Sequence, residues 1–260
     1  MSLLPLIDVH AHLQDDKFHE DCDEVVKRAV AAGVTHIINA GTSLTDSKKA
    51  LDVARQHQCC LALVGVHPHD ATTFDEHTLE QLTSLTADPN VLGIGEIGLD
   101  FHYDFSPRET QLRVFVELWQ LAAKLRLPAV IHVREAYDSF FSAIEGLAAP
   151  KKVLLHCFSG DLEIAQIASE KGFHFSTGGA LTYPKSEMTR EVFRMLPLDR
   201  IHLETDCPYL APQPRRGKRN EPSYLQFTLD FIAGLRNVSR DEMATILQRN
   251  AIDFFGERLA

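Results

Sequence analysis

The sequence lacks the segments that mark membrane, secreted and disulfide-stabilised proteins. No apolar run approaches the roughly 20 residues that a membrane-spanning helix needs. Met1 to Pro5 contain neither a basic segment nor a long apolar core, so we expect no signal peptide. The five cysteines are odd in number and scattered, which favours reduced thiols over a disulfide framework. We therefore expect a cytoplasmic protein with no membrane partner.

Positive charge is also scarce. The chain has 26 Lys and Arg against 36 Asp and Glu, a net charge of −10. That balance argues against a protein that coats nucleic acid nonspecifically. It does not exclude a polyanionic substrate, because part of the excess negative charge can belong to a carboxylate-bearing site that binds cations. One local exception, called the basic segment below, carries four positive charges within five residues: Arg215, Arg216, Lys218 and Arg219.

The length and the alternation of apolar runs with helical patterns predict a (β/α)8 TIM barrel. At 260 residues the chain has the usual size of one such barrel, so we expect a single domain over 1–260. The strands are expected near 6–12, 36–40, 61–66, 91–96, 129–132, 153–156, 173–177 and 201–204. Extra terminal helices are expected at 223–235 and 239–255. A doubly wound open sheet is the second candidate, but no Gly-x-Gly-x-x-Gly opens the first helix.

Several predicted strands end in residues that bind metals. The run Val91 to Ile94 leads into Glu96, and other runs lead into histidine or aspartate. A barrel brings the carboxyl ends of its strands to one face, where catalytic residues gather. Within the first strand, two imidazoles lie two residues apart and so point to the same side. The candidate ligands are His10, His12, Glu96, His132, His156 and Asp206.

Six ligands are too many for one tetrahedral zinc ion that keeps a position open for water. They suit two ions that share a carboxylate. We assign His10, His12 and Asp206 to one ion and His132 and His156 to the other, with Glu96 as the bridge. Two ions roughly 3.5–4 Å apart can activate water and stabilise a phosphoryl transfer. Asp206 could also serve as general base. For any single histidine, the alternative to metal binding is that it merely caps a strand.

The chain resembles the TatD-like metal-dependent deoxyribonucleases of the amidohydrolase superfamily. The resemblance runs from about Leu6 to Phe255, and Val9 and Gln14 depart from the usual residues without touching a proposed ligand. It rests on seven stretches: Ile7 to His12, Gly65 to Pro68, Gly93 to Asp100, Ile131 to Arg134, Leu155 to Gly160, Leu203 to Pro208 and Arg219 to Pro222. The family ligands fall on the same six positions.

The resemblance implies a hydrolase of phosphodiester bonds, a DNase that often works from the 3′ end. DNA ends, and RNA ends as an alternative, are therefore the expected partners, with no obligate protein partner evident. The family implies two divalent ions, with magnesium or manganese as the working metal. Four imidazoles suit zinc, manganese or iron better than magnesium, so zinc stays an alternative.

Further residues are expected to bind or position the substrate. His67 and Asp100 would orient substrate or ligands, although a plain structural role is nearly as good for His67. The fork of Arg134 suits a phosphate, with a salt bridge as the alternative. Tyr103 and its neighbour Phe101 could stack on a base, and core packing explains them equally well. The basic segment follows the eighth strand and could neutralise DNA phosphates, with a solvated loop as the alternative.

Two other functions compete with the nuclease. One is an amidohydrolase-type hydrolase of a small ester or C–N substrate. Many enzymes of that kind bridge their metals with a carboxylated lysine, whereas Glu96 stands here, which favours phosphoester chemistry. The other is a metal-binding protein without catalysis, against which the complete ligand set argues.

Overall fold

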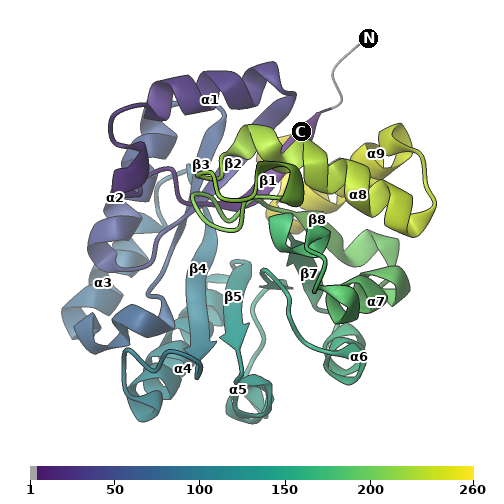
Figure 1. Ribbon diagram of the computed structural model, residues 1–260. Helices are drawn as coiled ribbons and strands as arrows, with labels where there is room; N and C mark the ends of the chain where they lie inside the picture. The colour runs from purple at the N-terminus through teal and green to yellow at the C-terminus, as the bar shows by residue number, and fades with distance from the viewer. Residues whose placement is uncertain (1–4) are drawn as a thin grey trace. The chain divides into compact units, whose positions relative to one another are not determined.

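The computed structural model describes residues 5–260. Strands and helices alternate along the chain (Figure 1), and the chain divides into two compact units. Residues 5–39 and 157–260 form one, called the terminal unit, and residues 40–156 form the other, called the central unit. Within residues 5–260, no helix has the length and apolar character needed to cross a bilayer.

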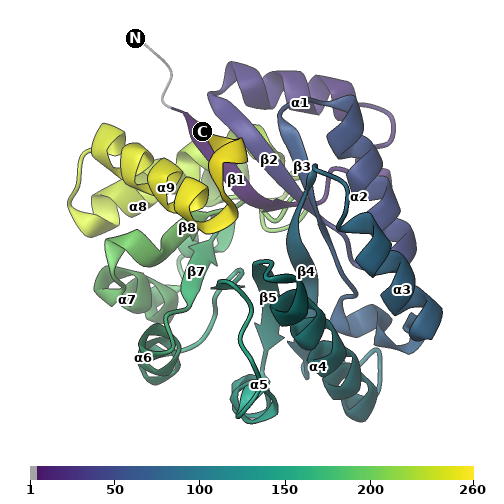
Figure 2. The same ribbon diagram turned by 180° about the vertical axis from the view of Figure 1, so that it is seen from behind.

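The central unit contains four consecutive parallel strands and the helices that follow them. Strand β3 pairs with β4, β4 with β5, and β5 with β6. Helix α2 packs on β3 and α4 packs on β4, and Figure 2 shows α2 and α3 side by side. The strands are β3 (Cys60–Val64), β4 (Val91–Asp100), β5 (Ala129–Arg134) and β6 (Val153–Leu155); the helices are α2 (Leu44–Gln56), α3 (Glu76–Leu85), α4 (Arg108–Leu125) and α5 (Tyr137–Ile144).

The terminal unit contains two further parallel pairs, β1 with β2 and β7 with β8. Its last two helices, α8 and α9, pack together at the yellow end of the chain in Figure 1. The Ser239 side chain accepts a hydrogen bond from the Glu242 amide and so caps the start of α9. The strands are β1 (Leu6–Ala11), β2 (Val34–Ala40), β7 (His174–Thr177) and β8 (Ile201–Leu203); the helices are α1 (Cys22–Ala31), α6 (Leu162–Glu170), α7 (Glu187–Met195), α8 (Leu225–Arg236) and α9 (Arg240–Phe255).

Strand β4 is longer than the sequence predicts, and this corrects the expected place of Glu96. All ten residues from Val91 to Asp100 are buried, so Glu96 lies inside the strand and Asp100 ends it. Gly98 explains the extension: it pairs with His132 of β5 at a φ of 146°, and a methyl group there would overlap the His132 carbonyl oxygen. The glycine therefore lets β5 approach β4 closely beyond the predicted end of the strand.

Other boundaries differ by a few residues. The strand expected at 36–40 begins at residue 34, and the one expected at 153–156 ends at Leu155, which leaves His156 in the following turn. The short 3-10 helices, among them η2 (Pro68–Thr73) and η5 (Gln213–Arg215), were not predicted. They lie in connections, where local hydrogen bonding rather than hydrophobic periodicity sets the conformation.

Candidate metal centre

In the terminal unit, the end of β1 lies beside the segment that follows β8. The Asp206 amide donates to the His10 carbonyl at 2.9 Å, and the His12 amide donates to the Cys207 carbonyl at 2.9 Å. Asp206 has a φ of 55°, a left-handed conformation that aspartate tolerates better than most residues. Its Oδ1 lies 3.4 Å from His12 Nε2 and 4.0 Å from His10 Nε2. One carboxylate and two imidazoles thus converge on one spot.

A buried carboxylate below this group fixes its backbone. Asp8 accepts hydrogen bonds from the Thr205 amide at 2.9 Å and the Thr205 hydroxyl at 2.6 Å. Burial raises the pKa of Asp8 to about 7, although the Thr205 hydrogen bonds pull it back. Asn220 adds a second brace, because its side-chain amide donates to the Thr205 and Tyr209 carbonyls at 2.8 and 2.7 Å. The loop that carries the basic segment is therefore closed at its base, beside Asp206.

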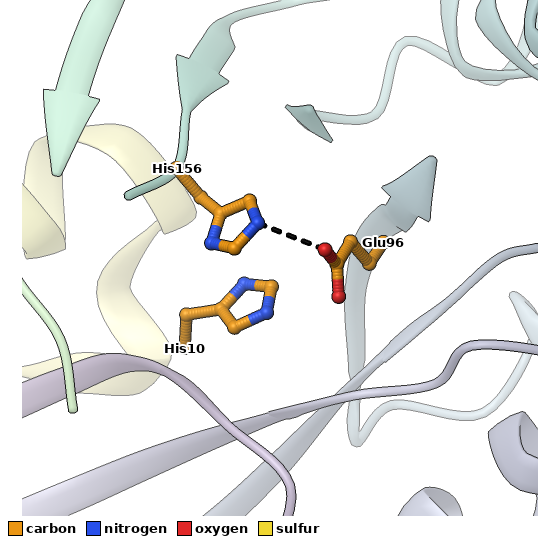
Figure 3. Close-up of side chains that lie close together, drawn as sticks. All are labelled: His10, Glu96 and His156. Atoms are coloured by element: carbon orange, nitrogen blue, oxygen red, sulfur yellow. Dashed lines mark hydrogen bonds and ion pairs between the residues drawn. The ribbon is translucent and has the colours of Figure 1, made fainter. Parts of the chain in front are cut away.

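In the central unit, three imidazoles surround one oxygen of Glu96. The Oε1 atom lies 2.8 Å from His156 Nε2, 3.0 Å from His132 Nδ1 and 3.3 Å from His67 Nε2. Figure 3 shows the contact between Glu96 and His156. His67 Nδ1 accepts the His69 amide hydrogen at 3.1 Å, so only Nε2 is directed at Glu96. Burial lowers the pKa of His67 to about 4 despite the nearby carboxylate. A neutral imidazole of this kind can bind a metal ion.

Asp100 lies on the far side of the His132 ring. His132 Nε2 is 3.0 Å from Asp100 Oδ2, while Nδ1 faces Glu96. Burial alone would lower the pKa of His132, but its bonds to Asp100 and Glu96 raise it. A carboxylate on one ring nitrogen that leaves the other for a metal is the usual support of a histidine ligand. The two expected roles of Asp100 are to orient the substrate or to orient a metal ligand. Its contact with His132 favours the second role.

The donor sets of both units fit metal ions. Imidazole nitrogens bound at about 2.0–2.1 Å to one tetrahedral ion stand about 3.3 Å apart. The donors observed here are separated by similar distances: 3.4 Å for His12 and Asp206, and 3.3 Å for His132 Nδ1 and His156 Nε2. In each unit, two imidazoles and a carboxylate offer ligand atoms within 4.8 Å of one another: His10, His12 and Asp206, and His67, Glu96 and His132.

Arg134 stacks on an aromatic side chain beside the central cluster. Its guanidinium carbon lies 4.8 Å from the centre of the Tyr103 ring. Tyr103 is half exposed, and Phe105, which the sequence reasoning missed, is 67% exposed and stacks on it. His69, also missed, has its Nε2 atom 3.1 Å from Asp100 Oδ2. The sequence does hold a signal for His69, since it follows His67 by two residues, although both lie beyond the end of β3, at and just inside the start of η2.

The four residues of the basic segment have different surroundings. Arg219 is held by the protein: it donates to both carboxylate oxygens of Asp21 at 2.8 and 2.7 Å. Arg216 stacks on the Tyr183 ring at 3.9 Å, and Arg215 stacks on Phe227 at 5.1 Å beside an open pocket of about 770 Å³. Lys218 is exposed. Three of the four cations thus lie in a solvent-facing loop, while Arg219 anchors that loop to the helix-α1 side of the unit.

Glu204 connects the turn after β6 to strand β7. Its Oε1 accepts the Cys157 amide hydrogen at 2.7 Å and its Oε2 accepts the Ser176 hydroxyl hydrogen at 2.6 Å. Cys207 is buried, and burial raises the pKa of its thiol well above the ordinary value.

Comparison with known proteins adds sequence and structural relatives of nearly full length. A sequence model of the family described as TatD related DNase matches residues 7–256. The "uncharacterized metal-dependent hydrolase YabD" of Bacillus subtilis is 37% identical over 252 residues, which cover 96% of this chain and 98% of that protein. The "3'-5' ssDNA/RNA exonuclease TatD" of Escherichia coli is 35% identical over 257 residues, with 96% and 99% covered.

Solved structures agree with these matches. The TatD homologue YjjV of Escherichia coli superposes with a TM-score of 0.92 at 31% identity, over 98% of this chain and 99% of that one. A TatD family hydrolase of Entamoeba histolytica gives a TM-score of 0.87 at 27% identity, over the same shares. Together with eight parallel strands that alternate with helices in the order β1 to β8, this likeness confirms the predicted (β/α)8 TIM barrel.

Proposed function

Because the chain belongs to the TatD-related DNase family, we propose that it is a divalent-metal-dependent hydrolase of phosphodiester bonds that removes nucleotides from the 3′ ends of single-stranded DNA or RNA. The observation that carries the proposal is the convergence of imidazoles on a buried carboxylate in the central unit, around Glu96. The family match supplies the reaction class, and the relative named as an exonuclease supplies the substrate class.

The proposed centre holds two ions. His10, His12 and Asp206 would bind one, His132 and His156 the other, and the two oxygens of Glu96 would be shared between them. The fit of donor atoms within each unit supports this division. When bound, such ions supply an activated water and stabilise the charge on the attacking and leaving oxygens. Magnesium or manganese is proposed as the working metal, with zinc as the alternative that four imidazoles favour.

The protein's own groups have distinct proposed roles. Asp206 retains some solvent exposure, 15% of its side chain, and is the proposed general base. Asp100 keeps His132 oriented, and His67 supports Glu96 as a neutral imidazole. Arg134 is proposed to bind a phosphate of the substrate near the central cluster. In the basic segment, Arg215, Arg216 and Lys218 are the proposed contacts to phosphates farther along the strand, and Arg219 holds their loop in place.

A small-ester or C–N hydrolase has less support. Enzymes of that kind often use a carboxylated lysine as the metal bridge, and the equivalent position here is Glu96. We also propose one domain over residues 1–260 and a cytoplasmic location. Five free cysteines among the described residues support that location, because thiols stay reduced there. No obligate protein partner is proposed.

A nucleotide-release assay tests the proposal. Purified protein is incubated with 3′-labelled single-stranded DNA, and in parallel with RNA, in the presence of Mg²⁺ or Mn²⁺ and again with a chelator. We expect labelled mononucleotides that disappear with the chelator and return when metal is restored. A 5′-labelled strand serves as the control for direction, since release should shorten it one nucleotide at a time. Release of nucleotides without metal, or no release from either the DNA or the RNA, would overturn the proposed function.

A further inference from the structure

Two aromatic rings lie exposed in the loop between β4 and α4. Tyr103 is 50% exposed and Phe105 is 67% exposed. Their rings are nearly parallel, with an angle of 9° and 5.2 Å between centroids. Leaving large apolar rings in water forgoes the stabilisation that burial brings, about 25 cal/mol per Å² of apolar surface. An ordered, solvent-facing stack of this kind therefore suits a ligand that supplies a flat apolar face.

The loop is fixed by the same carboxylate that supports the candidate metal ligand His132. Asp100 Oδ1 accepts the backbone hydrogens of His102 and Tyr103, both at 3.0 Å, while Oδ2 lies 3.0 Å from His132 Nε2. The Ser106 hydroxyl donates to the His69 carbonyl at 2.8 Å and closes the other end of the loop. The aromatic stack is thus rigidly connected to the central cluster through one side chain.

The ring contacts leave one broad face of the stack available. Tyr103 has Phe105 against it, the Arg134 guanidinium over its ring at 4.8 Å and the His102 ring roughly perpendicular to it at 4.7 Å. His69 is roughly perpendicular to both rings, with centroids 4.7 Å from Phe105 and 5.7 Å from Tyr103. A ring centred 4.7 Å above the outer face of Phe105 would stand well beyond 5.7 Å from Tyr103, so His69 does not cover that face. The outer face of Phe105 is therefore the face that solvent reaches.

We propose that the outer face of Phe105 is a stacking site for one nucleobase of the substrate, with Arg134 beside the stack to receive the adjoining phosphate. This inference rests on the proposed function and extends it to the choice of substrate. A base exposes its face to such a ring only when it is unpaired or splayed from its neighbour, so the site favours single strands. Stacking is tolerant of base identity, because every base has a π face. Phe105 acts here as a specificity-determining residue.

The test measures base stacking directly and does not depend on hydrolysis. A trinucleotide with phosphorothioate linkages, which slow cleavage, carries 2-aminopurine at the first, second or third position. Stacking on an aromatic ring quenches the fluorescence of 2-aminopurine. The metal-loaded wild type is compared with Phe105→Leu, which keeps apolar bulk without a π face, and with Phe105→Trp, which restores it. Met195→Ala removes another apolar side chain, 74% exposed, and is the control.

We expect strong quenching at one position in the wild type, in Phe105→Trp and in Met195→Ala. Phe105→Leu should lose that quenching and bind the trinucleotide about 5-fold more weakly or worse, the loss expected for one base–aromatic stack. Unchanged quenching in Phe105→Leu, or none in the wild type, would overturn the stacking site. The proposed function fails separately, through the absence of chelator-sensitive nucleotide release.

Discussion

Asp100 Oδ2 lies 3.0 Å from His132 Nε2, on the opposite side of the imidazole from Glu96. Burial alone would raise the pKa of Asp100, but the hydrogen bonds from His132 and from the Tyr103 amide hold it well below its usual range. The carboxylate therefore stays charged at neutral pH. It can accept the Nε2 hydrogen of His132 and leave Nδ1 with its lone pair directed at the proposed metal position.

Asp100→Asn should weaken metal binding without unfolding the protein. Asparagine keeps the shape of the side chain but removes the charge that orients His132, and losses of such supporting carboxylates commonly cost about 10- to 100-fold in metal affinity. Titration with Mn²⁺ or Zn²⁺ against a competing chelator measures the change. Asp104→Asn, four residues on, removes an exposed carboxylate bonded to Arg108 and is the matched control. Equal affinities in the two variants would contradict the orienting role.

Glu96→Ala should abolish most of the activity and lower the metal content, because the proposed bridge would be lost. The barrel should stay folded, since the change removes a buried charge rather than apolar packing. Elemental analysis of the purified protein, circular dichroism and nucleotide release together measure the effect. Full activity, or two ions still bound per chain, would exclude Glu96 as the bridge.

Arg134→Lys should damage catalysis although the charge is conserved. Lysine lacks the planar fork that binds a phosphate through two parallel hydrogen bonds and that stacks on Tyr103. We expect kcat/KM on a dinucleotide to fall by about tenfold, the size of one charge-assisted bond. The melting temperature should change little. A lower melting temperature with intact kinetics would instead assign Arg134 a structural role.

The exposed cations of the basic segment should matter for long substrates only. Replacing Arg215, Arg216 and Lys218 by serine should raise KM for an oligonucleotide and flatten its dependence on salt, since fewer counterions are released on binding. Turnover of a small chromogenic phosphodiester should barely change. Equal loss on both substrates would mean that the loop shapes the metal site. No loss on either would identify the segment as an ordinary charged surface.

Arg219 should behave differently, as a stabilising residue that acts through Asp21. Its hydrogen bonds lower the pKa of Asp21 below the ordinary value of 3.8. The stabilisation that this ion pair gives the folded state is therefore fully present above pH 3.8 and is lost as the pH falls through the lowered pKa of Asp21. Arg219→Met should reduce the melting temperature at pH 7 by about 1–4 °C, the range for a partly exposed pair. The difference from wild type should shrink below pH 3.8. Lys218→Met is the control, and a pH-independent difference would contradict the ion pair.

The barrel and the ligand types could be predicted because both leave local signals in the sequence. The spacing of His10 and His12 predicts that both face the same side, although β1 ends at Ala11 and His12 follows it, and apolar runs mark the strands themselves. The family resemblance and the fold class are confirmed, whereas the bridge at Glu96, the number of ions and the substrate contacts stay predictions. Strand β4 is longer than predicted, because Gly98 is compatible with either a turn or a close backbone contact, and only the pairing with β5 decides between them.

Relationships between distant residues left no such signal. Asp21 and Arg219 are 198 residues apart in the chain, so the sequence did not distinguish Arg219 from the other three cations of the basic segment. The stack of Phe105 on Tyr103 depends on how Asp100 folds the loop around itself, and periodicity does not describe loops. The hydrogen bonds that Asp100 accepts from the His102 and Tyr103 amides set the conformation of this loop. Their geometry depends on the folded backbone and cannot be inferred from the order of residues.

The side-chain amide of Asn220 joins the two ends of the loop after β8. The position of Asp206 therefore does not depend on how long that loop is. Ala211 and Gln213 are bonded to Tyr183 and Thr182, so the part of the loop that is free to change in length lies beyond them, around Gly217. At Gly217, with a φ of 83°, no neighbouring atom lies within 4 Å of where a side chain would begin. The segment is thus a natural insertion point, through which reach along a nucleic-acid strand can diversify without disturbing the proposed chemistry.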